Sequence, residues 1–279
     1  MKERRNVFGL GAGIWLALAI FAAGIGFGQE KAEVDKLEAL AMEAQNPVAN
    51  LISLPFQNNT SFGIGPHDRT QNVLNIQPVV PFSLNDDWNL ITRTICPLIY
   101  QPFVGQESGG KFGLGDINIT AFLSPAKPGK IMWGAGPIVS FPTATDEILG
   151  TEKWSAGPSA VVLTMPTPWV LGVLVNNIWD FAGDSDRAHV NRMLIQYFVN
   201  YNLPDGWYLS SAPIMTADWK APSGEKWTVP VGGGGGKVLQ IGGMPVNVSA
   251  QAFYNVEKPS GGPDWSMRLQ VQLLFPMGK

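Results

Sequence analysis

The last stretch of the chain, residues 265–275, alternates between apolar and polar side chains. Its apolar positions are Trp265, Met267, Leu269, Val271, Leu273 and Phe275, and between them lie Ser266, Arg268, Gln270, Gln272 and the exception Leu274. A period of two predicts a β-strand with one apolar and one polar face. The length fits a tilted strand that crosses a bilayer, which needs about 9–11 residues. Strands of soluble sandwiches are shorter, typically about five or six residues.

Comparable segments follow one another from residue 51 onward. Twelve strands are expected, at 51–62, 69–83, 88–103, 113–124, 131–142, 153–165, 169–181, 191–203, 207–219, 226–241, 244–257 and 265–276. In 113–124, one face carries Ile117, Ile119, Ala121 and Leu123, and the other carries Asp116, Asn118, Thr120 and Phe122. Segment 191–203 also alternates, with Leu194 and Phe198 as exceptions on its polar face.

The connections between these strands alternate in length. The generally longer set is 63–68, 104–112, 143–152, 182–190, 220–225 and 258–264, and the shorter set is 84–87, 125–130, 166–168, 204–206 and 242–243. Outer-membrane barrels have long extracellular loops and short periplasmic turns. A soluble sandwich, the alternative for any single strand, has no reason to sort its loops in this way.

Tryptophan is concentrated at the strand ends. Seven lie at or near strand starts and two at or near strand ends: Trp88, Trp133, Trp154, Trp169, Trp207, Trp227 and Trp265, then Trp179 and Trp219. Indole rings settle at the headgroup level of a membrane and form girdles around barrels. These patterns predict an all-β protein, a transmembrane up-and-down antiparallel β-barrel of about twelve strands.

Prolines inside the expected strands argue against an unbroken ladder, because proline has no N–H to donate. They are Pro55, Pro78, Pro97, Pro137, Pro158, Pro213 and Pro230. We expect bulges or breaks near them. Five glycines at 232–236 indicate a kink, a bulge or room for a group packed against the wall.

The N-terminal region predicts export. Lys2, Arg4 and Arg5 precede an apolar run from Val7 to Phe27, which is the layout of a signal peptide, and small residues place cleavage after Gly28. An uncleaved membrane anchor is the alternative. Residues 29–50 contain apolar residues at helical spacing, so a short helical segment is expected there, in the periplasm or in a barrel mouth. The expected division is 1–28 signal peptide, 29–50 helical segment and 51–276 barrel.

The composition of the chain excludes some classes of binding partner and of metal site. The net charge of −3 gives no sign of nucleic-acid binding, and the single cysteine, Cys96, excludes an intrachain disulfide and multi-cysteine zinc sites. No cofactor is expected. The expected partners are outer-membrane lipid, small-molecule solutes and the outer-membrane assembly machinery of a Gram-negative bacterium.

Several motifs carry a resemblance to a known group. They are the stretch 245–256 with Pro259, the stretch 265–276, the stretch 54–59, and 71–78 with Pro81. Across about residues 48–276 the chain resembles Gram-negative outer-membrane β-barrel proteins grouped as meta-pathway phenol-degradation or transporter proteins, some with a misleading neuromedin U label. The resemblance implies a barrel and passage of small solutes, aromatic ones among them. It implies no catalytic residues.

Seven charged residues on polar faces are candidates for the lumen: Arg93, Asp116, Asp180, Arg192, Asp218, Glu257 and Arg268. With a periplasmic N-terminus, most of them fall near the outer mouth and Arg93 falls near mid-barrel. One hypothesis is a mixed-charge constriction that selects small polar or aromatic solutes. The alternative is a salt-bridged network that fills a narrow lumen, since charges there must pair or stay wet.

A rim hydrolase is the rival class. His67 and His189 both fall in predicted outer loops near aspartates, and a His/Asp pair can do acid/base work. No strong nucleophile motif accompanies either histidine, so solvated loop residues are favoured. The two carboxylates of Asp184 and Asp186 could hold a cation, but a solvated turn is favoured there too. We therefore expect no enzyme, but an outer-membrane channel or transporter-like barrel, with a rim hydrolase or a non-conducting structural barrel as alternatives.

Overall fold

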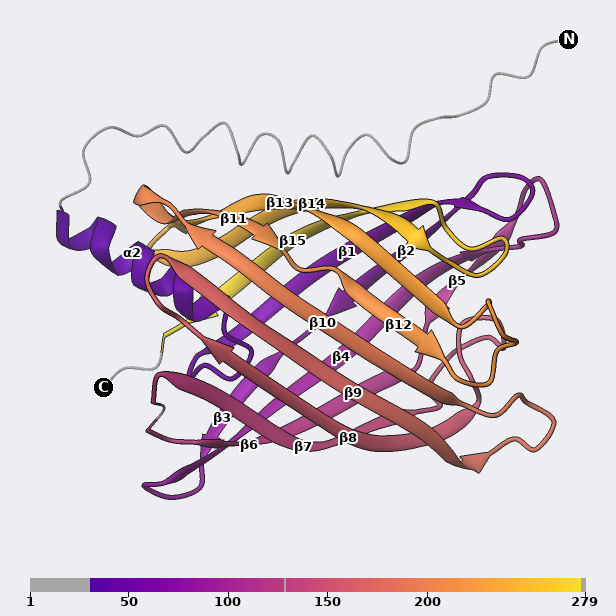
Figure 1. The fold of residues 1–279 in the computed structure, drawn as a ribbon, viewed down its shortest axis with the longest axis horizontal. Coiled ribbons are helices and arrows are strands. Elements are labelled where there is room, and N and C mark those ends of the chain that lie inside the picture. Colours follow the sequence, from indigo (N-terminus) through magenta and orange to yellow (C-terminus); the bar gives the residue numbers. More distant parts are fainter. Residues whose placement is uncertain (1–30, 128, 277–279) are drawn as a thin grey trace, which may run out of the picture.

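A computed structural model describes residues 31–127 and 129–276, and in it the chain forms a closed antiparallel β-barrel (Figure 1). One sheet contains fifteen strand segments: β1 (Ile52–Ile64), β2 (Arg69–Ile76), β3 (Val79–Ser83), β4 (Trp88–Pro102), β5 (Gly110–Leu114), β6 (Ile117–Pro125), β7 (Ile131–Phe141), β8 (Lys153–Thr164), β9 (Trp169–Gly183), β10 (Asn191–Asn202), β11 (Trp207–Ser211), β12 (Ile214–Asp218), β13 (Trp227–Ile241), β14 (Met244–Glu257) and β15 (Trp265–Phe275). Three pairs of segments are halves of one strand, so the barrel has twelve strands, as predicted.

The first and last strands close the barrel. β15 pairs with β1 over its whole length, from Phe62 opposite Trp265 to Ile52 opposite Phe275. Its other edge pairs with β14. No strand at this seam is left with an open edge, which is how a spanning sheet satisfies its backbone groups in lipid.

The three split strands correct the expected boundaries. The single strands expected at 69–83 and 207–219 are each broken beside a proline, at Pro78 and at Pro213. The strand expected at 113–124 begins earlier, at Gly110, and is broken at residues 115–116. A register shift between Val229 and Pro230 marks a bulge in β13. Missing N–H donors explain the proline sites.

Four of the prolines, Pro55, Pro97, Pro137 and Pro158, leave their strands intact. Pro137 of β7 lies directly opposite Pro158 of β8. The ladder on the other side of each is interrupted instead: β6–β7 pairing skips from Ile138 to Ala135, and β8–β9 pairing skips from Ala156 to Ser159. In these strands the lost donor affects one neighbour only.

Aromatic residues form a girdle near each end of the barrel. Near the short turns lie Trp88, Trp133, Trp169, Tyr201 and Trp207, and near the long loops lie Phe62, Phe141, Trp154, Trp179, Trp219, Trp227 and Trp265. Several pair across strands, as in the stacked rings of Phe62 and Trp265, with centroids 4.0 Å apart. Large apolar residues such as Val162, Val175 and Val199 are exposed on the strands between the girdles. This exterior is that of a membrane-spanning barrel.

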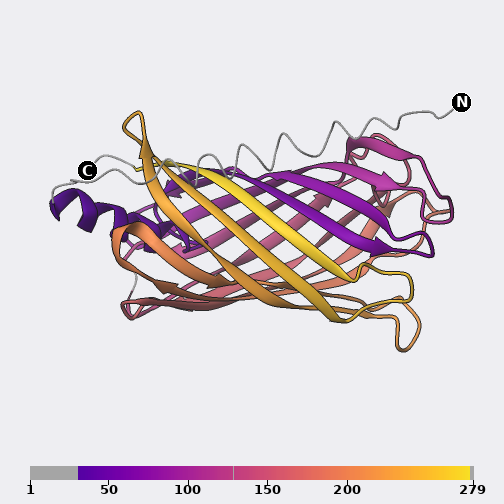
Figure 2. The ribbon, with the colours of Figure 1, turned by 90° about the horizontal axis from the view of Figure 1, so that it is seen from above.

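Helix α2 (Lys31–Ala44) lies at the end of the barrel that carries the short turns (Figures 1 and 2). We call this the turn end and the opposite one the loop end. The buried face of α2, Leu37, Leu40 and Ala41, packs against Val238 of β13 and Leu274 of β15. None of the helices among the described residues is long and apolar enough to cross a membrane. The predicted signal peptide, 1–28, lies outside the described residues.

Candidate functional site: the barrel lumen

Two chemically different walls line the inside of the barrel. The polar wall, on β1, β14 and β15, carries buried amides and one arginine: Gln57, Asn247, Gln251, Arg268 and Gln272. The apolar wall, on β4, β6 and β8 to β10, carries Ile91, Phe122, Val161, Leu163, Val170, Leu174 and Phe198. Both sets project inward, because the alternate residues of the same strands face lipid.

Three cavities lie in a row along the lumen. The turn-side cavity has a volume of about 170 Å³, the central cavity about 520 Å³ and the loop-side cavity about 430 Å³. Neighbouring cavities share lining residues. Gln57, Gln77, Arg93 and Gln196 line both the turn-side and the central cavity. Asn118, Ile178 and Arg192 line both the central and the loop-side cavity.

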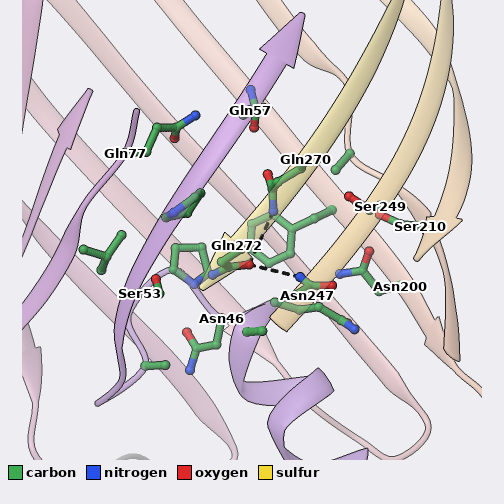
Figure 3. A pocket seen from close by; sticks show the side chains of 18 of the residues that line it. Asn46, Ser53, Gln57, Gln77, Asn200, Ser210, Asn247, Ser249, Gln270 and Gln272 are labelled. Carbon is green, nitrogen blue, oxygen red and sulfur yellow. Dashed lines mark hydrogen bonds between the residues drawn. The ribbon is translucent and has the colours of Figure 1, made fainter. Parts of the chain in front are cut away.

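The turn-side cavity is lined mostly by neutral polar groups (Figure 3). Its labelled side chains come from the polar wall, from neighbouring strands and from the segment after α2: Asn46, Ser53, Gln57, Gln77, Asn200, Ser210, Asn247, Ser249, Gln270 and Gln272. Asn247 Nδ2 donates to Gln272 Oε1 over 3.0 Å, the bond that is dashed in Figure 3. These amides can accept and donate hydrogen bonds but carry no charge.

The glycine run makes room for Tyr208 in this cavity. Gly236 of β13 lies opposite Tyr208 of β11. A side chain at Gly236 would collide with the Tyr208 ring and with the Val248 carbonyl. The buried Tyr208 hydroxyl donates to Asn247 Oδ1 over 2.7 Å. The run therefore stays within a strand and serves close packing.

Two of the predicted lumen residues, Arg93 and Arg268, line the turn-side cavity together. Arg93 Nη2 donates to Gln77 Oε1 over 2.6 Å. Arg268 is 7% exposed, donates through Nε to Asn59 Oδ1 and through Nη1 to the Ala212 carbonyl, and lies over the Phe253 ring. Within the described residues neither arginine forms an ion pair.

The other predicted lumen residues lie nearer the loop end. Arg192 Nε donates to Asp218 Oδ2 over 3.1 Å, and both side chains line the central cavity. Asp116 lines the loop-side cavity and accepts hydrogen bonds from the backbone and the hydroxyl of Thr151. It thereby fastens the loop 142–152. These charges are separated from the arginine pair by the central cavity.

Asp180 and Glu257 line none of the three cavities. Asp180 accepts from the Val190 backbone and contacts His189 Nδ1 at 2.8 Å. Glu257 is exposed at the end of β14. Both positions are at the loop end, where the sequence placed them, but they take no part in the row of cavities.

The segment that follows α2 forms part of the wall of the turn-side cavity. Residues 43–47, Ala49 and Leu51 line it. Val48 is buried in the apolar wall, and Gln45 Nε2 donates to Asn202 Oδ1 over 2.8 Å. Burial raises the pKa of Glu43, the carboxyl group of this segment. The barrel mouth at the turn end is therefore occupied by residues 43–51.

The histidines differ in their surroundings. The His189 side chain is 73% exposed and contacts Asp180, but no hydroxyl among the described residues forms a hydrogen bond with it. His67 lies in the connection between β1 and β2, outside the three cavities. Asp184 Oδ1 accepts from the Asp186 backbone, which closes a turn. No group of three or more metal-ligating side chains occurs in the described part of the chain.

Solved structures share this architecture. No protein-family model matches the chain, and no curated protein matches it. The structure is similar to that of the COG4313 outer membrane channel from Pseudomonas putida F1. The two superpose with a TM-score of 0.62 at 18% identity, over 81% of this chain and 94% of that one. At this identity, the likeness shows a shared barrel fold.

Two further structures match more weakly. The Salmonella typhi outer membrane phospholipase (OMPLA) dimer with bound calcium has a TM-score of 0.41 at 13% identity, over 86% of this chain and 97% of that one. The Pseudomonas putida toluene transporter TodX has a TM-score of 0.39 at 9% identity, over 89% of this chain and 93% of that one.

The sequence did not single out the neutral amides or Tyr208 as site residues. The sequence did contain a sign of the apolar wall. Leu194 and Phe198 are the two apolar residues on the polar face of their strand. Phe198 belongs to the apolar wall and Leu194 packs against it. Apolar residues on an expected polar face thus marked a second kind of lumen surface.

Proposed function

We propose that the protein is an outer-membrane channel through which small solutes pass along the lumen. The observation that carries this proposal is the row of three cavities with shared lining residues. A barrel filled by packed side chains would leave no such series. The membrane-type exterior and the even number of strands support insertion in the outer membrane of a Gram-negative bacterium.

The described part of the N-terminal segment, residues 31–50, acts in this proposal as a gate at the turn end. Val48 packs into the apolar wall, Gln45 is bonded to Asn202, and α2 packs against Val238 and Leu274, so contacts with several strands hold the segment in the mouth. Solute passage then requires residues 43–51 to move. We also propose that the mature chain begins after Gly28 and that the outer-membrane assembly machinery inserts residues 51–276.

Planar-bilayer recordings on the purified barrel test this function. We expect discrete conductance steps, and larger or longer ones in Val48→Asp, because a carboxylate is unfavourable against the apolar wall. Deletion of residues 29–46 should have the same effect. Leu84→Asp, in an exposed turn at the same end of the barrel and outside all three cavities, is the matched control. Silence of the wild type and of both gate variants would reject the channel.

A rim hydrolase remains the second candidate because of the 2.8 Å contact between His189 and Asp180. Esterase or phospholipase activity in the same preparations, abolished by His189→Ala, would favour it. The implied role in the metabolism of aromatic compounds is a further proposal. Uptake of labelled phenol by cells with and without the protein would test it.

A further inference from the structure

Arg93 and Arg268 place positive charge in the lumen that no described side chain neutralises. Every ion pair among the described residues lies elsewhere. The partners of the two guanidinium groups are amide and carbonyl oxygens of Gln77, Asn59 and Ala212. A buried charge needs an opposite charge or water, and neutral amides supply only part of that stabilisation.

The carboxylates that line the same cavities do not reach the arginine pair. Glu43 lines the turn-side cavity, but it forms no ion pair with either arginine. In the central cavity, Asp218 is paired with Arg192, and Glu225 accepts hydrogen bonds from Ser260. The site around Arg93 and Arg268 therefore has a net positive charge.

Arg93 also has donors to spare. A guanidinium has five N–H groups, and one hydrogen bond from Arg93 to the described part of the chain is recorded, the one to Gln77. Arg93 lines both the turn-side and the central cavity. Its free N–H groups are thus available to a solute at the junction of the two.

An apolar surface adjoins this charge. Phe122 and Leu174 of the apolar wall, together with Leu194, line the central cavity that Arg93 borders. Its volume of about 520 Å³ falls within the range of small-molecule sites, about 300–1,000 Å³. A solute at this junction meets cationic donors at one end and hydrocarbon at the other.

We propose that this junction binds an amphipathic carboxylate, with its carboxylate on Arg93 and Arg268 and its apolar body against Phe122, Leu174 and Leu194. Planar guanidinium groups match the two oxygens of a carboxylate. The proposal deepens the proposed channel function by naming the solute class. It differs from a mixed-charge constriction, because neither arginine forms an ion pair and the net charge of the site is positive.

Equilibrium binding to the full barrel in detergent or nanodiscs tests the site without requiring conduction. We expect benzoate to bind at least about tenfold more tightly than benzamide, its uncharged isostere, where tenfold corresponds to about 1.4 kcal/mol. Acetate and inorganic phosphate separate the contributions of charge and apolar body. Both should bind more weakly than benzoate. Equal binding of benzoate and benzamide would overturn the proposal, and so would tighter binding of phosphate.

Variants locate the binding. Arg93→Gln and Arg268→Gln should each weaken benzoate binding at least about tenfold, because each removes a charged donor. Arg187→Gln, at an arginine that pairs with Glu152 and lines none of the three cavities, is the matched control and should leave it within about twofold. If a glutamine variant fails to fold, Arg93→Lys keeps the charge but loses the planar fork, and should weaken binding. Unchanged binding in a folded Arg93 variant would refute the site.

The two proposals fail separately. A barrel that conducts but does not discriminate benzoate from benzamide would retain the channel and lose the carboxylate site. A barrel that binds benzoate through Arg93 but never conducts would retain the site and lose the channel.

Discussion

The polar wall and the apolar wall belong to one closed sheet, yet they stabilise the lumen by different means. On the polar wall, side chains satisfy one another through hydrogen bonds, as Asn247 and Gln272 do, and Tyr208 of the nearby β11 donates its hydroxyl to Asn247. On the apolar wall, Phe122, Leu174 and Phe198 pack as in a soluble core. The segment after α2 contacts both sides, since Val48 packs into the apolar wall while Ala49 and Leu51 cluster with Leu274 of β15, a strand of the polar wall.

This difference shows that the inner face of a membrane barrel is not bound to be polar. Lipid dictates the outer face alone. Inside, apolar residues are stable wherever they exclude water together, and charges are stable only where polar groups or water surround them. Arg93 and Arg268 accordingly bond to amide side chains, whereas the apolar Val48 packs against the apolar wall.

The largest expected effect is on the apolar wall. Phe122→Ala should lower the free energy of unfolding by about 3–5 kcal/mol, because it removes a buried ring from a packed cluster. Urea titration of the refolded barrel in lipid measures this. Gln270→Ala on the polar wall should cost only about 0.5–1.5 kcal/mol, the loss of one hydrogen bond. Equal costs would show that the two walls do not differ in kind.

A smaller effect is expected where the polar wall meets the glycine run. Gly236→Ala should destabilise the barrel by about 1–3 kcal/mol, since the new methyl group collides with Tyr208 and the Val248 carbonyl. Gly105→Ala, whose side chain meets nothing within 4 Å, is the control and should be near neutral. The same titration applies. A neutral Gly236→Ala would mean that the Tyr208 ring moves freely.

Removing the Tyr208 hydroxyl, which bonds to Asn247 of the polar wall, should lower the free energy of unfolding by a smaller amount. Tyr208→Phe keeps the ring and loses the hydrogen bond to Asn247, so we expect a loss of about 1 kcal/mol. Tyr197→Phe is a suitable comparison, because its hydroxyl lies 3.5 Å from Ser211 Oγ and forms a weak bond. If Tyr208→Phe is as stable as the wild type, water replaces the hydroxyl and the chain of polar contacts is not cooperative.

The strands were predictable because independent signals coincide. In 265–275 the alternation, the leading tryptophan and the preceding loop 258–264 all agree, and the observed β15 is Trp265–Phe275. Breaks were less predictable. Pro78 and Pro213 split their strands, whereas Pro137 and Pro158 do not, and the sequence cannot reveal toward which neighbour a missing donor would have pointed.

The site was less predictable than the fold. Arg93 and Arg268 are distant in the chain, and only the stagger of strands around the closed barrel determines that they line one cavity. The sequence placed Arg93 near mid-barrel and grouped Arg268 with Asp116, Arg192 and Asp218 near the outer mouth, whereas Arg268 lines the turn-side cavity. Faces follow from alternation, but depth in the lumen follows from register and shear.

The smallest expected effect is a pH dependence of the hydrogen bonds that link the loop between β14 and β15 to the loop between β12 and β13. Ser260, between β14 and β15, donates to Glu225, between β12 and β13, and these hydrogen bonds hold the pKa of that carboxyl below its ordinary value of 4.5. The stability that the ionised Glu225 carboxylate adds through these hydrogen bonds is therefore fully present above pH 4.5. It is lost as the pH falls through the lowered pKa.

Hydrogen exchange at the Ser260 amide tests this response. Protection should decline on acidification in the wild type, whereas Glu225→Gln should show constant protection over the same range. Benzoate binding at the arginine pair should be insensitive to Glu225→Gln, since that carboxylate bonds to Ser260 and not to Arg93 or Arg268. A shift in benzoate affinity in this variant would mean that the loop contact and the polar wall are coupled through the central cavity.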